Sequence, residues 1–459
     1  MNSIFIFRRD LRIKDNIGFI NCFNKSKNVY PIFIFTYEQI KNNDFKSSNA
    51  VQFMVESLKD LDKELKKYDS KLHLFYGKID TIISYLIKEK NINAVFTNTD
   101  YTPYAIKRDN DLEKLCKKNK VEFNISHDYC LFEPGTIKTG SDTTYQKFTP
   151  FYNIAVLKKV NQPIKKKYDN KLKKLSGLKH SINFKKTKDF YKHNNDIHVN
   201  GGRKNAKLVL KKLKEMKDYE NFRNELNIET TNMSAFIKFG CLSIREVYHK
   251  LAKLYNKKHP LIRQLIWREF YYHLNVGFID RFGKSLKPKY DKIKWSKNET
   301  LFEKWTKGQT GFPVIDACMQ QINNTGFMHN RGRLIVASFL IKNLHHDWRK
   351  GEKYFAQQLV DYDPFVNNGN WQWVSGSGAD SQPYFRIFNP MSQSKNYDKE
   401  AKYIKKWLPN LESVPAKDLH DWPSNYKKYD LKDLKYYEPI IDYKKSRQVV
   451  IDKYKDALY

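Results

Sequence analysis

The spacing of apolar residues changes part-way along the chain, and this change limits the folds that the chain can adopt. In the first part, short runs rich in β-branched and aromatic residues alternate with longer stretches of helical periodicity. We expect strands at residues 4–7, 30–36, 72–76 and 94–98, with helices at 50–68 and 79–90 between them. Such alternation is typical of a parallel sheet with helices on its faces.

The usual phosphate-binding turns are absent from this first part. It contains neither G-x-G-x-x-G nor G-x-x-x-x-G-K-[ST], in which glycine-rich turns hold nucleotide phosphates. We therefore expect a Rossmann-like parallel sheet without that motif, and the ligand of this part stays open.

Helical periodicity dominates the rest of the chain. A lysine-rich, poorly periodic stretch over residues 157–200 fits a long surface connection. Beyond Gly201, helices are expected at residues 206–216, 244–254, 261–274, 314–322 and 331–344. The sequence therefore predicts an α/β domain over residues 1–130, a long basic connection over 131–200 and an all-α domain over 201–459.

The charge of the chain favours a polyanionic partner. Its 459 residues include 84 Lys and Arg against 50 Asp and Glu, which gives a formal net charge of +34. Nucleic acid is the leading candidate, because cations on a protein release counterions from phosphates. Part of this charge reflects a general abundance of Lys, Asn, Ile and Tyr, which is typical of A/T-rich codons.

No targeting or membrane segment is evident. The opening MNSIFIFRRD has the wrong order for a secretory signal, and no apolar stretch approaches the roughly 20 residues needed to span a bilayer. We expect a soluble intracellular protein without a membrane partner, in the cytoplasm or nucleoid, or in a nucleus, depending on its source.

The cysteines and histidines do not predict a metal site. The five cysteines are scattered and include no C-x-x-C pair, so we expect buried or free thiols. His345 and His346 are adjacent and cannot share one helical face. We predict that the protein binds no metal.

Six of the eight tryptophans lie between residues 267 and 373. Taken alone, these tryptophans also fit the packing of a helical core. Gln264, Trp267 and Arg268 would share one helical face, since they are spaced i, i+3 and i+4, and Asn330, Arg333 and Leu334 repeat that spacing. Asp361, Asp363 and Asn367 follow in an acidic loop, and an Arg333–Asp361 ion pair is expected. Taken alone, each set also fits a structural role.

Six strings in the chain resemble the photolyase and cryptochrome family, in that family's order. They are RRDLRIKDN, QLIWREFYYHL, TGFPVIDACMQQI, GFMHNRGRL, DWRKGEKYFAQQLVDYDP and NNGNWQWVSGSGADSQPYFRIFNP. The resemblance runs from Ser3 to about Tyr454 and is closest to the bacterial-type (class I) cyclobutane pyrimidine dimer photolyases.

The resemblance implies a fold, a cofactor and a reaction. The fold would be an α/β domain joined to an all-helical domain that holds FAD. The reduced anionic FAD would absorb blue light and pass an electron to a pyrimidine dimer that has been flipped out of damaged DNA. The protein would be a deoxyribodipyrimidine photo-lyase, expected to act as a monomer. A second antenna chromophore, folate or deazaflavin, would occupy the first domain.

The resemblance also assigns residues to FAD. The phosphate and ribityl loop would comprise Tyr219, Thr230, Thr231, Met233 and Ser234. The isoalloxazine ring would be surrounded by Arg268, Asn330, Arg333, Asp361, Asp363 and Asn367. Asn367 matches the partner of the reactive flavin nitrogen, and an Asn there points to a repair enzyme.

Further residues match contacts to the lesion and to DNA. Trp267 and Trp373 match the aromatic pair around the flipped dimer, and Gln264, Asn330 and Leu334 match its other contacts. Arg331 and Arg386 match contacts on the phosphate side. Trp371, Trp348 and Trp295, in that order from flavin to surface, match the chain that reduces FAD by light-driven electron hopping.

Two departures from the family pattern concern the substrate. Gln264 stands where bacterial-type enzymes carry a glutamate, so repair efficiency or lesion preference could be altered, and Leu334 replaces a methionine. The histidine pair of (6-4) photolyases is missing at Asn330 and Leu334, which argues against that lesion. The alternatives are a cryptochrome-type photoreceptor without repair activity and a basic nucleic-acid-binding protein with a vestigial pocket.

Overall fold

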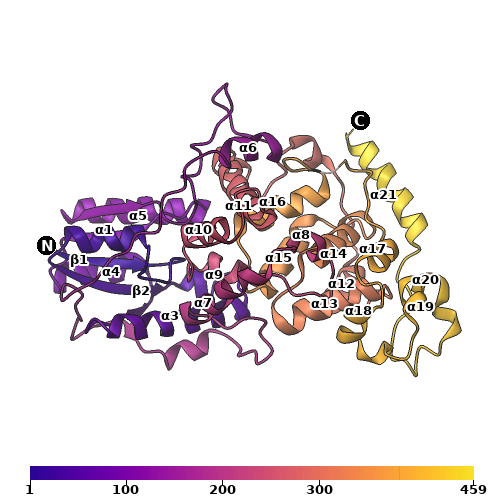
Figure 1. Ribbon diagram of the computed structural model, residues 1–459, viewed down its shortest axis with the longest axis horizontal. Coiled ribbons are helices and arrows are strands. Elements are labelled where there is room, and N and C mark those ends of the chain that lie inside the picture. Colours follow the sequence, from indigo (N-terminus) through magenta and orange to yellow (C-terminus); the bar gives the residue numbers. More distant parts are fainter. Residues whose placement is uncertain (382, 459) are drawn as a thin grey trace.

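A six-stranded sheet forms the centre of the first half of the protein. The structure is a computed structural model that describes residues 1–381 and 383–458 (Figure 1). The strands are β1 (Asn2–Phe7), β2 (Asn28–Phe35), β3 (His73–Tyr76), β4 (Ala94–Asn98), β5 (Glu122–Ser126) and β6 (Ser181–Ile182). They lie in the order β5-β4-β1-β2-β3-β6. All neighbours pair in parallel except β3 and β6, which are antiparallel.

Alternation along the strands places helices on both faces of this sheet. The helices of this half are α1 (Ile17–Lys25), α2 (Tyr37–Ile40), α3 (Ser48–Lys66), α4 (Ile79–Glu89) and α5 (Pro103–Lys118). Phe5 and Phe33 share a buried cluster with α1 and α3. Ile4 and Ile6, which point to the opposite face, share another cluster with α4 and α5. The predicted α/β architecture is confirmed, and the strand at 94–98 has the expected bounds.

Several elements of this half escaped prediction from the sequence. The edge strand β5 was not expected, and its residues are partly or fully exposed. The helices α1 and α5 were not expected, and the antiparallel β6 comes from the connection rather than from the first domain. The predicted parallel sheet is therefore parallel except at this edge.

The connection over residues 131–200 contains more structure than a surface loop. It holds the helix α6 (Phe148–Ala155), the strand β6 and the 3₁₀ helix η1 (Lys186–Phe190). Phe148, Phe151 and Ala155 on α6 are buried. Their spacing of three and four residues is typical of a helix. The sequence of this segment therefore indicated a helix within its lysine-rich surroundings.

The second half is entirely helical in the part of the chain that the structure describes. Its α-helices are α7 (Arg203–Lys212), α8 (Tyr219–Phe222), α9 (Ser234–Lys238), α10 (Ile244–Leu254), α11 (Pro260–Gly277), α12 (Glu299–Lys307), α13 (Pro313–Thr325), α14 (Asn330–Lys342), α15 (Trp348–Gln358), α16 (Pro364–Ser375), α17 (Pro390–Tyr397), α18 (Lys402–Trp407), α19 (Ala416–His420), α20 (Trp422–Asn425) and α21 (Tyr443–Leu458). Short 3₁₀ helices lie at η2 (Leu213–Glu215), η3 (Ile279–Arg281), η4 (Pro288–Lys292), η5 (Pro409–Leu411) and η6 (Tyr426–Lys428).

Four of the five helices predicted here are confirmed with close bounds. The fifth, expected at 206–216, is α7 followed by η2. No helix among residues 1–381 and 383–458 has the length and apolar character needed to cross a membrane.

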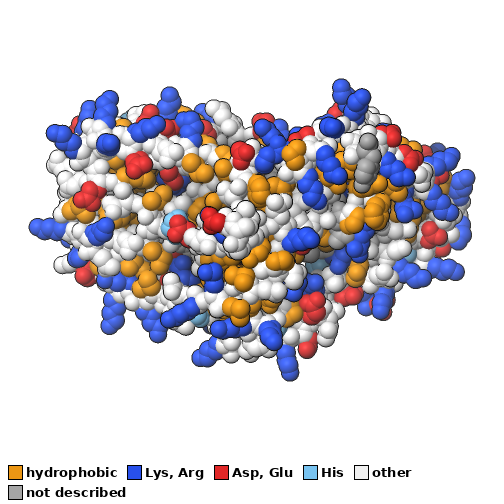
Figure 2. All heavy atoms as spheres, turned by 90° about the horizontal axis from the view of Figure 1, so that it is seen from above, with side chains coloured by type: hydrophobic (Ala, Val, Ile, Leu, Met, Phe, Trp, Pro, Cys, Tyr) orange, Lys and Arg blue, Asp and Glu red, His pale blue; other side chains and the backbone are white. Residues whose placement is uncertain are grey.

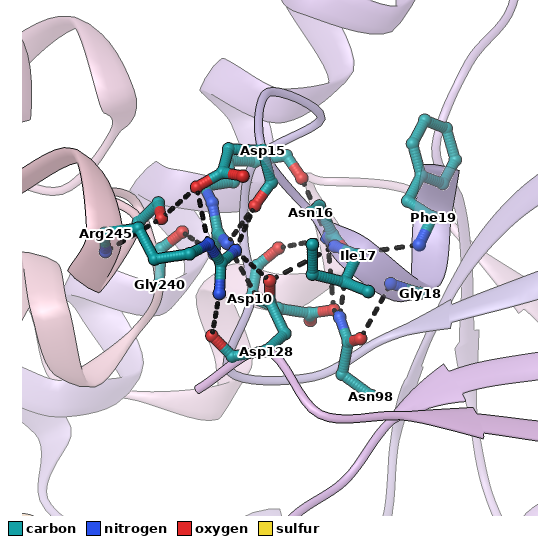
Figure 3. Close-up of polar contacts among 12 residues, drawn as sticks. Asp10, Asp15, Asn16, Ile17, Gly18, Phe19, Asn98, Asp128, Gly240 and Arg245 are labelled. Carbon is teal, nitrogen blue, oxygen red and sulfur yellow. Dashed lines mark hydrogen bonds and ion pairs between the residues drawn. The ribbon is translucent and has the colours of Figure 1, made fainter. Parts of the chain in front are cut away.

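A buried ion cluster joins the two halves (Figure 3). Arg245 on α10 donates to Asp128 at 2.7 Å and to Asp15 at 3.0 Å, and Arg12 also donates to Asp128 at 2.7 Å. Burial alone would raise the pKa of Asp128, but the charges of Arg12 and Arg245 outweigh it and lower that pKa. Because each buried charge has an opposite partner, the cluster defines how α10 meets the loop after β1.

Close backbone contact accompanies this cluster. Gly240 has a φ of +63°, and a Cβ at that position would lie 2.3 Å from the carbonyl oxygen of Arg9. Only glycine permits both the left-handed backbone and this approach.

Candidate active site

Helix α11 presents the face that the sequence predicted. It begins at Pro260 behind the cap His259, and it packs against α6 and α16. Gln264, Trp267 and Arg268 are each partly exposed on it. The side-chain amide of Gln264 makes no hydrogen bond within residues 1–381 and 383–458, so it is free to bind a ligand.

Arg268 has a hydrogen-bond donor without a partner in the described part of the chain. Its guanidinium lies 4.2 Å from the ring centroid of Tyr129, and Nη1 lies 3.4 Å from Oε1 of Glu269. Nη2 is buried and has no hydrogen-bond partner in the described part of the chain. A buried donor without a partner is costly, so this nitrogen fits an acceptor on a bound cofactor, such as a ring carbonyl oxygen.

The expected ion pair between α14 and the acidic loop is present. Nη2 of Arg333 lies 2.9 Å from Oδ2 of Asp361. Burial alone would raise the pKa of Asp361, but the charge of Arg333 and its hydrogen bonds outweigh it and lower that pKa. Asp361 thus connects α14 with the loop that precedes α16.

Asp363 and Asn367 lie at the start of α16. One oxygen of Asp363 caps the helix at Phe365 and Val366. Its Oδ2 accepts hydrogen bonds from Tyr272 at 2.7 Å and Tyr129 at 3.0 Å. Asn367 donates its amide nitrogen to the backbone oxygen of Asp363. Its amide oxygen has no donor among the described residues and is therefore open to an N–H of a ligand.

The predicted phosphate loop is only partly exposed. Thr230 and Thr231 are half-buried, and Ser234 is exposed. Met233 is 4 % exposed and belongs to the main hydrophobic core, so its backbone, rather than its side chain, faces any ligand. Tyr219 begins α8 and is half-buried.

Of the three predicted electron-transfer tryptophans, only the last in the expected order is partly exposed. Trp371 and Trp348 are buried, at 3 % and 1 % exposure, whereas Trp295 is partly exposed. Gly351, one helical turn beyond Trp348, leaves room for Trp371, since a Cβ there would lie 2.3 Å from that ring.

The lesion and DNA contacts expected from the sequence, other than Arg386, lie on α11, α14 and α16. Asn330 is exposed at the start of α14, and Leu334 follows one turn later, half-buried. Arg331 donates to Asn224 at 2.7 Å and covers the ring of Tyr397 at 4.4 Å. Trp373 is partly exposed on α16.

Helix packing gathers most of these residues. Helix α16, which carries Asn367, contacts both α11 and α14. Because α11 carries Gln264 and α14 carries Asn330, the three helices form one group around these side chains. Arg386 is exposed, and no hydrogen bond or ion pair joins it to the other predicted site residues in the described ranges.

Several neighbours of this site were missed from the sequence. Arg9, Tyr129 and Tyr272 surround Asp363 and Arg268. The only available signal was the string RRD after β1, because Tyr129 and Tyr272 stand in unremarkable aromatic runs. Arg223 was also missed. Burial is the main cause of the lowered pKa of Arg331, and the positive charge of Arg223 lowers that pKa further.

A cavity of about 870 Å³ lies at the carboxyl edge of the sheet. Its apolar lining includes Phe7, Phe33 and Met54, and its polar lining includes Arg9 and Asp100. Arg9 follows β1 and Asp100 follows β4, where chain connections leave the sheet in opposite directions. Such switch points commonly bind ligands.

No cluster of three or more His, Cys, Asp or Glu side chains suited to a metal is found among the described residues. The five cysteines, Cys22, Cys116, Cys130, Cys241 and Cys318, are buried and free, as expected.

Two sequence families match this chain. The family described as "DNA photolyase" matches residues 3–168, and the "FAD binding domain of DNA photolyase" matches residues 261–456. The chain is 35% identical to the deoxyribodipyrimidine photo-lyase of Buchnera aphidicola (subsp. Baizongia pistaciae), over 99% of this chain and 98% of that protein. The chain belongs to the DNA photolyase family. Its identity to the photo-lyase of Escherichia coli K12 is 32%, over 98% of each protein.

Solved structures of photolyases share this fold. An archaeal photolyase from Sulfolobus tokodaii, solved with two FAD molecules, gives a TM-score of 0.89 at 36% identity, over 99% of this chain and 100% of that one. A class III photolyase from Agrobacterium tumefaciens gives 0.90 at 30% identity, over 99% and 97%. A cryptochrome from Synechocystis gives 0.89 at 24% identity, over 98% and 99%, which shows the fold alone. As a photolyase, the chain uses FAD.

Proposed function

We propose that this protein repairs cyclobutane pyrimidine dimers in DNA with light, as a deoxyribodipyrimidine photo-lyase. The observation that carries the proposal is the grouping of α11, α14 and α16 around free hydrogen-bonding groups. Nη2 of Arg268, the amide oxygen of Asn367 and the amide of Gln264 lack partners in the described part of the chain. These groups can form hydrogen bonds with a flavin ring and with the edge of a base.

FAD would be held between the two acidic-loop carboxylates and α11. Arg268 and Asn367 would bind the flavin ring, and the backbone around Thr231 with the hydroxyl of Ser234 would bind the phosphates. When bound and reduced, FAD supplies the electron for repair after it absorbs light. The Arg333–Asp361 pair would hold α14 and the loop before α16 at the distance that the cofactor requires.

The flipped dimer would lie against exposed side chains of the same helices. Trp267 and Trp373 would stack on it, and Gln264 and Asn330 would hydrogen-bond its base edges. Stacking of a base on an aromatic ring contributes about 1 to 3 kcal/mol. Gln264 donates a hydrogen bond without carrying charge, so lesion binding through this residue would not titrate.

The DNA would approach a strongly basic face. Figure 2 shows many Lys and Arg side chains and fewer acidic ones on the side viewed there. Arg331, with Arg223 beside it, and Arg386 would contact phosphates. This charge supports binding to the DNA backbone, whose strength falls with salt. We propose that the protein acts as a monomer in the compartment that holds the DNA.

A second chromophore would occupy the cavity at the carboxyl edge of the sheet. Its volume lies within the range of small-molecule sites, and the apolar lining by Phe7, Phe33 and Met54 suits a flat aromatic ring. A folate, a deazaflavin or a second flavin meets this description.

The test is light-dependent repair by flavin-loaded, reduced protein. DNA with defined thymine dimers is illuminated with blue light, and recovery of thymine absorbance is compared with a dark control. Recovery only in light supports the proposal. No recovery with reduced flavin present contradicts it and favours another lesion or a photoreceptor. Gln264→Glu, tested alongside, would introduce a pH dependence of lesion binding if this side chain contacts the dimer.

A further inference from the structure

Trp267 lies directly on another aromatic ring that belongs to the connection between the two halves. The ring centroids of Phe148 and Trp267 are 3.6 Å apart, and the ring planes differ by only 5°. Phe148 is 1 % exposed, whereas Trp267 is partly exposed. One face of Trp267 is thus covered by protein.

Phe148 is itself held on several sides. Its ring meets Phe270 edge-on at 5.9 Å, and the guanidinium of Arg263 lies 5.1 Å from its centroid. Phe151, one turn later on α6, packs against Phe270 at 5.5 Å. Helix α6 is therefore anchored on α11 by two rings, and Phe148 has little freedom to turn.

We propose that Phe148 is a positioning residue that orients Trp267 for the flipped dimer. This inference rests on the proposed function, in which Trp267 stacks on the lesion. An indole that is free to rotate loses conformational entropy when a base stacks on it, and a ring fixed beforehand avoids that loss. Because Phe148 covers one face, it also restricts the lesion to the other face and the edges of Trp267.

The test compares three variants in flavin-loaded protein kept in the dark. Phe148→Leu keeps an apolar side chain of similar size but loses the flat ring, and Phe148→Tyr keeps the ring. Phe151→Leu is the matched control, since Phe151 is buried on the same helix and no ring contact joins it to Trp267. Affinity is measured for duplexes with and without one thymine dimer. Fluorescence of 2-aminopurine opposite the lesion reports base flipping.

Phe148→Leu should weaken binding to the dimer by about 2- to 10-fold, the range expected for one aromatic pair. Its affinity for undamaged DNA should not change, and its repair rate at saturating DNA, measured separately under blue light, should stay near that of the parent. Phe148→Tyr should bind the dimer like the parent protein. An equal loss in Phe151→Leu, or no loss in Phe148→Leu, would overturn the inference.

A double-mutant cycle with Trp267→Leu separates this inference from the proposed function. If Phe148 acts through Trp267, Phe148→Leu should have no further effect in the Trp267→Leu background. If Trp267→Leu weakens dimer binding and Phe148→Leu weakens it additively, the positioning role is wrong and the lesion site stands. If Trp267→Leu leaves dimer binding unchanged, both the lesion contact and the positioning role are wrong.

Discussion

Arg9 places Nη1 3.5 Å from Oδ2 of Asp363, and its Nη2 donates to Asp100 at 2.8 Å. It also lines the cavity at the carboxyl edge of the sheet. A single guanidinium thus connects the cavity, the end of β4 and the start of α16. The proposed flavin site at Asp363 and the cavity at the carboxyl edge of the sheet therefore share one charged residue, Arg9.

Removing this charge should make the protein more sensitive to acid. Burial alone would raise the pKa of Asp363, but the charges of Arg9 and Arg268 outweigh it and lower that pKa. A carboxylate with a lowered pKa contributes stability at neutral pH that is lost as pH falls through its folded-state pKa. Arg9→Met should raise the folded-state pKa, so acid unfolding, followed by circular dichroism, should begin at higher pH. Lys353→Met, in an exposed pair with Asp44, should leave that midpoint unchanged.

Asp361→Asn should impair both stability and FAD retention. It leaves Arg333 without its buried partner, which costs roughly 3 kcal/mol for a buried pair. The measurement is the midpoint of denaturant unfolding together with the flavin retained after gel filtration. Asp44→Asn, which breaks an exposed pair with Lys353, should leave stability nearly unchanged. Full flavin retention in Asp361→Asn would contradict the proposed site.

Trp371→Phe should slow photoreduction of oxidised FAD and leave repair by the pre-reduced enzyme nearly intact. The indole is the more easily oxidised ring, so its loss interrupts the proposed chain beside the flavin. The measurement is flavin absorbance during illumination with an external electron donor. Trp407→Phe, on α18 and outside the chain, is the control. Loss of repair by pre-reduced Trp371→Phe would show that the residue has another role.

The free energy of unfolding should fall as pH rises from about 5 to 7, because Glu352 is buried and loses its proton over this range. Burial raises its pKa to about 7, and its partners are the neutral groups of Tyr362 and Asn368. Between the unfolded and folded pKa values the folded state binds more protons, so rising pH favours unfolding, by at most about 3 kcal/mol. Glu352→Gln should flatten this slope in denaturant unfolding measured at several pH values. An unchanged slope would show that another group carries it.

Local patterns were enough to predict much of the fold and part of the site. The short β-rich run from Ile4 to Phe7 predicted a strand, and the spacing of Gln264, Trp267 and Arg268 predicted their common helical face. Both follow from chain geometry over a few residues. The domain bounds and the closeness to class I enzymes stay predictions.

Contacts between distant segments were decided only by the tertiary structure. Arg9 and Tyr272, which share a hydrogen bond of 3.1 Å, are 263 residues apart. The stack of Phe148 on Trp267 and the cavity beside β1 and β4 likewise join separate elements. Periodicity reports which face of an element is apolar, and it does not report which other element will cover that face. The sequence therefore determined the elements and the candidate residues, whereas packing determined which of them meet.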